Sequence, residues 1–497
     1  MDEERAPASR PIHVVIDVDP DLAGQAGLQH LLWLLVALLT RSTRELIANV
    51  RLETIDAPLL PGIDPSSPDG GHSLVAALKA AADAFGVEAA PVMNDWDAVE
   101  RPDLVLQIGG TVAVRSASNV LHVSAAGWAG AVTAQPDGDL PLDLNSRNPF
   151  GPYVAACLAA GQAYMYARVR GHELSTAALD AWSLEQDPSN LPRDAVAYRG
   201  EPAVHLDHVL AGVGAVGSAL LQTLWAYQPA AGTVRAADAD PQGVDDTNLN
   251  RCLPFHRSDL GQPKAHVAAR RLSGHHGLVV EPLHDVAETL VGPRTNLVSA
   301  VDTPEARAAL QDKYPASAVQ ASTAGLRLEM LRVDPNHGTA CLRCFNPPHE
   351  RTPDSEIWAQ VAEMDDDAIA AHAAAVGTDP HQVRHWGRTG GCGQVGDALL
   401  ARLRPSDGGA AQFSVGFMSV LAGTLLAAQV IKDAVRRDGE PRDAAYAVPL
   451  NGPTARFVTN CLDSAHAPAG ARRYARDKTC PACEGVRRDV WAQRYTG

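Results

Sequence analysis

The chain has little of what several classes of protein need. Its 497 residues include only eight cysteines, and aromatic residues make up 5% of the sequence. Cysteines this sparse do not form the dense framework of a disulfide-rich secreted protein. Basic residues are also in the minority, with 42 Lys and Arg against 58 Asp and Glu and a formal net charge of −16. Because nucleic-acid backbones need basic surfaces, this balance argues against nucleic acid as a partner.

Long apolar runs are also missing. The densest one, LLWLLVALL at residues 31–39, is too short to span a bilayer. It lies beyond an acidic N-terminus and lacks the basic region that precedes the apolar core of a secretory signal. We therefore interpret it as a buried helix, and we expect a cytoplasmic protein without a membrane partner.

At this length the chain exceeds what one hydrophobic core supports, and its pattern predicts two α/β units. Residues 1–170 contain the strand-like segments PIHVVIDVD, NVRLETID, DLVLQIGG and NVLHVSAAGW, which alternate with helical segments. This alternation predicts a mostly parallel sheet covered by helices. Residues 171–199 mix polar residues with prolines, and we expect them to form a connector with a short helix.

The strongest pattern lies in the second unit, which we expect over residues 200–345. A short apolar strand leads into a glycine turn, GVGAVG, that contains Gly212, Gly214 and Gly217 and is followed by a helical segment. Such a turn lets the backbone approach a phosphate, and the N–H groups of the helix N-terminus point toward it. A second strand ends at Asp238, roughly 20 residues further on, where an acid can bond a ribose. This context predicts a Rossmann-like nucleotide-binding domain.

Polar residues suited to phosphate handling follow the second strand. They are Asn248, Asn250, Arg251 and Lys264, and Asp240 in the same stretch is a further candidate for binding the nucleotide. Arginine and lysine neutralise phosphate oxygens, and asparagine amides orient them. A further strand ends near Asp302, a carboxylate well placed to hold Mg²⁺. The set predicts adenylyl transfer, in which a carboxylate attacks the α-phosphate of ATP and pyrophosphate leaves.

Two Cys-x-x-Cys pairs form a second strong motif. They are Cys341 with Cys344, and Cys480 with Cys483. Four thiolates in two such turns fit a tetrahedral Zn²⁺, and no further ligand suggests an open catalytic position. The long separation predicts a structural clasp that ties residues 411–497 back onto the nucleotide-binding domain. The alternative is two unrelated thiol pairs.

Together these motifs resemble the ubiquitin-activating (E1-like) adenylyltransferases, the superfamily of the ThiF, MoeB and HesA proteins. The resemblance covers residues 200–345 and 410–485 and rests on GVGAVG, DADPQGVDDTNLNR, GQPKA, AVDTPEAR and the cysteine pairs. It implies that Asp238 binds the ribose of ATP and that Asp302 coordinates Mg²⁺. It also implies that Arg251 and Lys264 bind the phosphates, with Asn248 or Asn250 beside them. Cys252 departs from the family, in which a glutamine usually follows the arginine.

The resemblance also gives the first unit a role, because some E1-like proteins carry an inactive copy of the adenylation domain ahead of the active one. The chain is then an internal pseudo-dimer, with a homodimer as the alternative. Residues 346–410 are a long insertion, a kind of segment that is often functional. Within it, Cys392 lies in the glycine-rich stretch RTGGCGQVGD, with His381 and His385 as candidate bases. The resemblance implies that Cys392 takes over the activated carboxyl group as a thioester.

The favoured interpretation is therefore an E1-like activating enzyme that uses ATP, Mg²⁺ and a structural Zn²⁺. Its implied substrate is a small ubiquitin-like (β-grasp) protein with a free C-terminus, and its implied acceptor is an E2-like carrier enzyme, as in bacterial ubiquitin-like conjugation systems. One alternative is a ThiF- or MoeB-like adenylyltransferase that acts on a sulfur-carrier protein or a small peptide. Another class, an NAD(P)-dependent oxidoreductase, is supported by the glycine turn and Asp238 alone.

Overall fold

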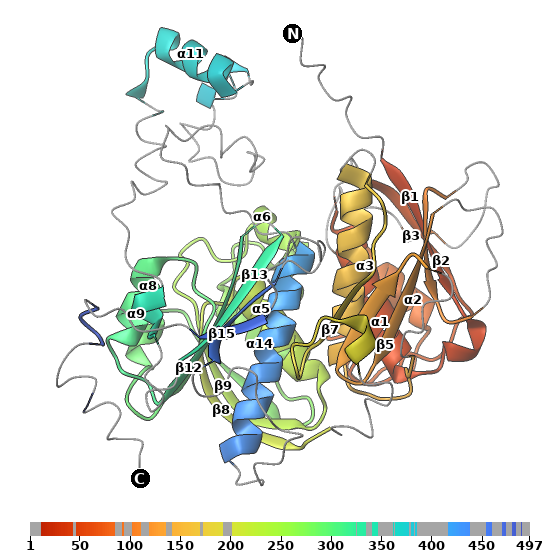
Figure 1. Ribbon diagram of the computed structural model, residues 1–497, viewed down its shortest axis with the longest axis horizontal. Coiled ribbons are helices and arrows are strands. Elements are labelled where there is room, and N and C mark those ends of the chain that lie inside the picture. The colour runs from red at the N-terminus through yellow and green to blue at the C-terminus, as the bar shows by residue number, and fades with distance from the viewer. Residues whose placement is uncertain are drawn as a thin grey trace.

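A computed structural model gives the fold as two α/β units, each built around its own sheet (Figure 1). The residues that the structure describes are 11–42, 46–84, 92–93, 102–110, 119–135, 142–168, 172–191, 201–324, 326–333, 340–345, 361, 363–376, 379–381, 383–384, 416–437, 454–459, 470–473, 480–483 and 489.

The N-terminal unit is built on a seven-stranded sheet with the strand order β3-β2-β1-β4-β5-β6-β7. The strands are β1 (Ile12–Val18), β2 (Ile47–Glu53), β3 (Val92–Met93), β4 (Leu104–Ile108), β5 (Val120–Ala126), β6 (Ala129–Thr133) and β7 (Ala177–Asp180). All neighbours run parallel except β6, which is antiparallel to both β5 and β7. The apolar strand β4 is buried at every position, as expected of a central strand covered on both faces.

Among the described residues, this unit has the α-helices α1 (Ala26–Thr40), α2 (Leu74–Asp83) and α3 (Phe150–Arg168). The apolar run predicted to be a buried helix lies in α1, and every residue of α1 is buried. Ser73 caps α2, because its hydroxyl accepts a hydrogen bond from the N–H of Ala76 at 3.0 Å. The short 3-10 helix η1 (Pro20–Leu22) follows β1 directly.

The predicted connector at residues 171–199 contains a strand that the sequence reading missed. β7 pairs antiparallel with β6, so the N-terminal unit continues past its predicted end at residue 170. β7 has the sequence AALD, which lacks the β-branched and aromatic residues that mark strands. It is nevertheless buried at all four positions. A 3-10 turn, η2 (Pro188–Asn190), follows it.

The second unit is built on an eight-stranded sheet with the order β10-β9-β8-β11-β12-β13-β14-β15. The strands are β8 (Val204–Ala211), β9 (Ala230–Ala237), β10 (Leu278–Leu283), β11 (Asn296–Ser299), β12 (Ser317–Ala324), β13 (Arg327–Val333), β14 (Thr454–Thr459) and β15 (Gly470–Arg473). The strands from β10 to β12 run parallel, and those from β12 to β15 alternate in direction. The prediction of a mostly parallel Rossmann-like sheet is confirmed.

The described helices of the second part of the chain all fall between those strands in sequence. They are α5 (Ala215–Ala226), α6 (Asp246–Leu249), η3 (Arg257–Asp259), α7 (Lys264–Leu272), η4 (Ala287–Thr289), α8 (Pro304–Gln311), α9 (Leu342–Phe345), α11 (Asp366–Val376) and α14 (Gly416–Arg437). The alanine-rich α11 falls inside the insertion, as its composition predicts.

The two sheets repeat one topology, in which β1 to β7 correspond in order and direction to β8 to β14. The long helices also correspond, since α3 lies between β6 and β7 and α14 lies between β13 and β14. The units differ in what precedes that helix: residues 134–149 in the first unit and residues 334–415 in the second. The long insertion therefore belongs to the second unit alone.

The units pack against each other through α3 and α14, which lie side by side between the sheets (Figure 1). α14 also lies directly on α5, where a Cβ atom at Gly423 would be only 2.6 Å from the carbonyl oxygen of Val216. Lys432 of α14 crosses to the first unit and donates a hydrogen bond to the carbonyl of Trp182. Its ammonium nitrogen is 5.3 Å from the centre of the Trp182 ring. The two units thus share one continuous hydrophobic core.

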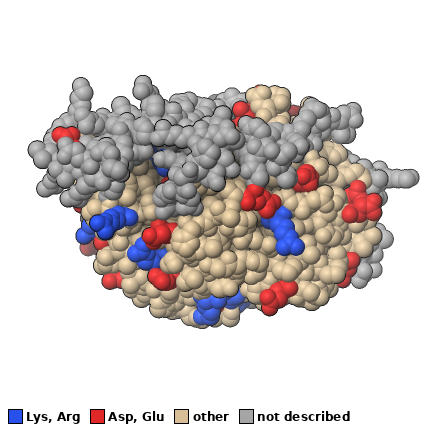
Figure 2. Space-filling view, turned by 90° about the horizontal axis from the view of Figure 1, so that it is seen from below, with Lys and Arg blue, Asp and Glu red and all other residues tan. Residues whose placement is uncertain are grey.

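By length and composition alone, α14 could cross a membrane, over Gly416–Val435. That whole stretch is buried inside the protein, which accounts for its apolar character. On the face shown in Figure 2, the described basic and acidic side chains are interspersed.

Candidate functional site

The glycine turn lies at the carboxyl end of β8, where the parallel strands of the second sheet end. Gly212 has φ of +89°, a conformation strained for residues with a side chain. A Cβ atom at Gly217 would lie 2.0 Å from the carbonyl oxygen of Gly212, so the turn leaves no room for a side chain there. Gly214, the N-cap of α5, has no heavy atom within 4 Å of where its Cβ would be. Open backbone at a helix N-terminus suits an anion.

Asp238 follows β9 and braces the glycine turn from the neighbouring strand end. One carboxylate oxygen accepts a hydrogen bond from the N–H of Val213 at 2.7 Å, and the other accepts one from the N–H of Asp240 at 3.1 Å. The side chain is partly exposed. Since a carboxylate offers about four acceptor positions, Asp238 keeps capacity for a ribose hydroxyl.

Lys264, the first residue of α7, forms an ion pair with Asp240, with Nζ 2.5 Å from Oδ2. Burial alone would lower the pKa of Lys264. The hydrogen bond to Asp240 and the negative charges of Asp238 and Asp240 outweigh burial, and the pKa is raised. Burial raises the pKa of Asp240, but the bond from Lys264 outweighs it and the net shift is downward. The site therefore holds a charged ammonium group at neutral pH.

The segment after β9 is shaped by a capping box at the start of α6. The Asp245 carboxylate accepts a hydrogen bond from the backbone N–H of Asn248 at 3.0 Å. In return, the side-chain amide oxygen of Asn248 accepts one from the backbone N–H of Asp245 at 3.1 Å. Asn248 is buried and serves the backbone, whereas Asn250 is exposed and Arg251 partly exposed. Of the two asparagines, Asn250 is thus the one whose side chain is accessible to a ligand.

Asp302 lies three residues beyond the end of β11 and is exposed. The end of β11 packs on the glycine turn, since the nearest atoms to a Cβ at Gly212 belong to Ala300 and Val301. Arg307 of α8 holds this segment, because its Nε donates to the carbonyl of Val301 at 3.0 Å. Burial lowers the pKa of Arg307, while the charge of Asp302 opposes that shift. Asp302 therefore projects beside the turn with a cation near it.

Electrostatic contacts connect the separate parts of the predicted site. Lys264 lies close enough to Asp238 for that negative charge to raise its pKa, and the Cys252 thiol lies close to both Lys264 and Arg251. Cys252 is fully buried, and burial raises the pKa of its thiol despite the nearby cations. It is a core residue of the loop. The structure thus places Asp238, Lys264 and Arg251 near one another beside the glycine turn.

Sequence reasoning missed one residue at this loop, Arg41. It stands at the C-cap of α1 in the N-terminal unit and is buried. Its guanidinium group donates to the carbonyls of Leu249, Cys252 and Leu253 in the other unit. This contact joins residues more than two hundred positions apart in the sequence, and a local sequence motif cannot predict it.

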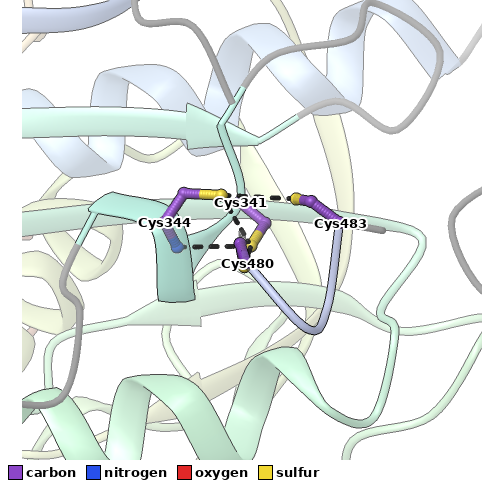
Figure 3. Close-up of side chains that lie close together, drawn as sticks. All are labelled: Cys341, Cys344, Cys480 and Cys483. Atoms are coloured by element: carbon purple, nitrogen blue, oxygen red, sulfur yellow. Dashed lines mark hydrogen bonds between the residues drawn. The ribbon is translucent and has the colours of Figure 1, made fainter. Parts of the chain in front are cut away.

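The four predicted metal ligands come together in one buried cluster (Figure 3). Their sulfur atoms all lie within 4.8 Å of one another. Cys341 Sγ is 3.7 Å from both Cys344 Sγ and Cys480 Sγ, and Cys344 Sγ is 3.4 Å from Cys483 Sγ. None of the four forms a disulfide.

This donor set fits Zn²⁺. Four sulfurs at about 2.3 Å from a tetrahedral zinc stand roughly 3.8 Å apart, close to the separations found. Neighbouring thiols and burial raise the pKa of Cys341, so a cation is what would allow these sulfurs to be thiolates together. The first pair is anchored on α8, because the N–H of Leu342 donates to Gln311 Oε1 at 3.1 Å. The second pair comes from the C-terminal end of the chain, which matches the predicted clasp.

Other predicted residues fall outside this picture. Cys392 and His385 lie in residues 385–415, outside the described residues, so the expected nucleophile stays a prediction. His381 is described and exposed. Cys157, expected to be core, is buried in α3.

The second unit matches a known protein family. The ThiF family matches residues 202–471, which is more than half of the chain. The chain therefore belongs to the ThiF family, within the E1-like superfamily, and it is an adenylyltransferase of the E1-like kind.

Solved structures and curated proteins were compared as well. Among the solved structures, 145 chains match, and one is titled "Crystal structure of E. coli MccB + MccA-N7isoASN". It is 17% identical, with a TM-score of 0.35, and the match covers 57% of this chain and 68% of that chain. No curated protein matches.

Proposed function

We propose that this protein is an E1-like activating enzyme that adenylates the C-terminal carboxylate of a small ubiquitin-like protein with ATP and Mg²⁺. The observation that carries the proposal is the combination of Lys264 and Arg251 with the glycine turn and Asp238. A dinucleotide oxidoreductase needs the turn and the acid but has no use for two cations beside them. Family membership supports the same choice.

Each residue then has a defined task in adenylyl transfer. The α5 N-terminus and the glycine turn bind phosphate oxygens, and Asp238 bonds the ribose. Lys264 leaves Asp240 in part to bind a phosphate, and Arg251 neutralises charge that develops as pyrophosphate leaves. Asp302 would hold Mg²⁺, which neutralises phosphate charge when it is bound.

We further propose that the N-terminal unit is an inactive copy of the adenylation domain. Its topology repeats that of the second unit, but the turn after its first strand reads Asp19-Pro20-Asp21 where the second unit has Gly212-Val213-Gly214. Proline lacks an N–H group, and two acids repel phosphate. One chain then supplies both halves of a pseudo-dimer, which supports a monomer over a homodimer.

The proposed second step is thioester formation at Cys392. Its thiolate attacks the carbonyl carbon of the acyl adenylate, forms the carbon–sulfur bond and releases AMP. The acyl group then passes to an E2-like carrier. A sulfur-carrier protein or a small peptide is the alternative substrate, and that chemistry ends at the adenylate or continues with sulfur transfer.

Pyrophosphate exchange tests the adenylation step. With a small β-grasp protein encoded by a neighbouring gene, the wild type should exchange label between pyrophosphate and ATP, and Asp302→Ala should lose at least about a hundredfold of the rate. Exchange that needs no carrier, or that survives in Asp302→Ala, contradicts the proposal.

The thioester step has a separate test. A carrier adduct that thiol reductants cleave should form with the wild type and be absent from Cys392→Ala, while pyrophosphate exchange continues in that variant. Cys157→Ala is the matched control, because that thiol is buried in α3. An adduct that persists in Cys392→Ala removes this cysteine from the mechanism. Pyrophosphate exchange without any such adduct in the wild type favours the sulfur-carrier or peptide alternative.

A further inference from the structure

Arg41 reaches from one unit into the loop of the other that carries the phosphate-site arginine. Its Nη1 donates to the carbonyl oxygens of Leu249 and of Cys252, the latter at 2.9 Å, and its Nη2 donates to the carbonyl of Leu253 at 2.6 Å. Arg251 lies inside the segment bounded by these three carbonyls. A single guanidinium group therefore holds both flanks of Arg251.

The loop needs such a donor. The carbonyls at and after the last turn of a helix lack partners within it and carry partial negative charge, and Leu249 is the last residue of α6. Arg41 supplies a planar fork of charged donors at this point, which lysine cannot reproduce. Burial lowers the pKa of Arg41 to about 9, so the group stays charged at neutral pH.

The repeated topology provides an internal comparison. α5 in the second unit corresponds to α1, and Gln228, just after its C-terminal end, donates to the carbonyl of Pro61 at 3.2 Å. Pro61 follows β2, as the Arg41-bound loop follows β9. The two contacts are equivalent in position, but one is a partly exposed amide that donates a single bond to the loop, and the other is a buried arginine that donates three. The contact with three hydrogen bonds, made by Arg41, holds the loop that lies next to the glycine turn.

We propose that Arg41 is a positioning residue for the phosphate site: it fixes the backbone around Arg251, so that the N-terminal unit completes the ATP site in cis without touching the nucleotide. This inference rests on the proposed ATP binding. It predicts that losing the clamp weakens binding of the phosphates and spares the nucleoside.

The test uses the full-length chain with Arg41→Met, which keeps the aliphatic stem and loses the donors. ATP–Mg affinity should fall by at least about tenfold, while adenosine affinity changes by less than about twofold. A merely structural role would weaken both ligands alike. Arg41→Lys, which keeps the charge but offers one nitrogen, should give an intermediate loss and serves where Arg41→Met folds poorly.

A double-mutant cycle isolates the route. In an Arg251→Met background, Arg41→Met should cost little further ATP affinity, because the residue that it positions is gone. Gln228→Ala is the matched control, since it breaks the equivalent contact of the other unit and should leave ATP affinity unchanged. Full ATP affinity in Arg41→Met, or additive losses in the double variant, overturns the inference. A wild type that binds no ATP overturns the proposed function instead.

Discussion

Lys264 Nζ lies 2.5 Å from Asp240 Oδ2 at the end of β9, so the site pairs its lysine with an acid. Lys264 thus places a cation where a phosphate is expected to bind. The Asp240 carboxylate already binds that cation and would compete with a phosphate for it. On the proposed function, an incoming phosphate would have to compete with this carboxylate for the lysine, which would favour a highly charged group such as a triphosphate.

Replacing Lys264 tests that role. Lys264→Met keeps the stem and loses the charge, and we expect ATP–Mg affinity to fall by about tenfold or more, the range for a charged hydrogen bond of about 1.5–3 kcal/mol. The cost in stability should be within about 1 kcal/mol, because Asp240 is a third exposed. Titration calorimetry measures the first effect and urea unfolding the second. Lys313→Met, on an exposed position after α8, is the control, and equal affinities for the two variants would show that Lys264 does not bind phosphate.

The two glycines of the turn should behave differently. Gly217→Ala places a methyl group against the carbonyl of Gly212, so it should lower both stability and ATP affinity. Gly214→Ala meets no protein atom, so it should leave the thermal midpoint within about 1 °C while lowering ATP affinity about tenfold, because the methyl group occupies the approach of the phosphate. A Gly214→Ala variant with normal ATP affinity would place the phosphates elsewhere.

Local spacing explains how much of the site could be predicted. The turn, Asp238, Lys264 and the cysteine pairs are each defined by neighbours close in sequence, and they are recognisable for that reason. Arg41 could not be found this way, because it binds backbone carbonyls, which have the same chemistry at every residue. Asn248 was one of two asparagines expected beside the phosphates. Its side-chain amide oxygen instead closes a capping box, which the Asp-x-x-Asn spacing could have revealed.

The fold shows the same division. Strands with β-branched residues, such as β1 and β4, are evident in the sequence, but β7 is AALD and forms a strand because tertiary pairing with β6 overrides propensity. The order of strands and helices shows the repetition of topology between the units, whereas the glycine motif does not, since the two turns that follow β1 and β8 share no glycine pattern.

Acidification should weaken the protein through His256. Burial, followed by the charges of Arg271 and Arg41, lowers the pKa of this residue to about 4. Between that value and the ordinary value of 6.5 the unfolded chain binds the proton and the folded chain does not, so the free energy of unfolding falls as pH falls through this range.

We expect His256 to contribute a loss of about 1–2 kcal/mol between about pH 7 and pH 5, measured by urea unfolding. His256→Asn keeps an N-cap residue for η3 and removes the titration, so its loss should be smaller. Buried His30, whose pKa is lowered to about 3 by burial, leaves part of the effect. His266→Asn, at an exposed position on α7, should match the wild type, and a His256→Asn variant with the full loss would locate the titrating group elsewhere.

The cysteine cluster predicts that metal and C-terminal structure are linked. Cys344 lies in α9 and Cys341 immediately precedes this helix, beside α8, and Cys480 and Cys483 bring the end of the chain to the same point. Cys480→Ser should abolish bound zinc, measured by elemental analysis at one ion per chain in the wild type, and should lower stability by several kcal/mol, since binding energy at a structural site is folding energy. A strong chelator should reproduce the loss in the wild type and have no effect on the variant.

Limited proteolysis gives the site of the change, because the chain after β14 should become sensitive when the metal is removed while the glycine-turn region stays protected. Cys157→Ala, a buried thiol in α3, controls for loss of a cysteine as such and should retain zinc. Wild-type protein that contains no zinc, and whose stability the chelator leaves unchanged, would mean that the four sulfurs pack together without a metal.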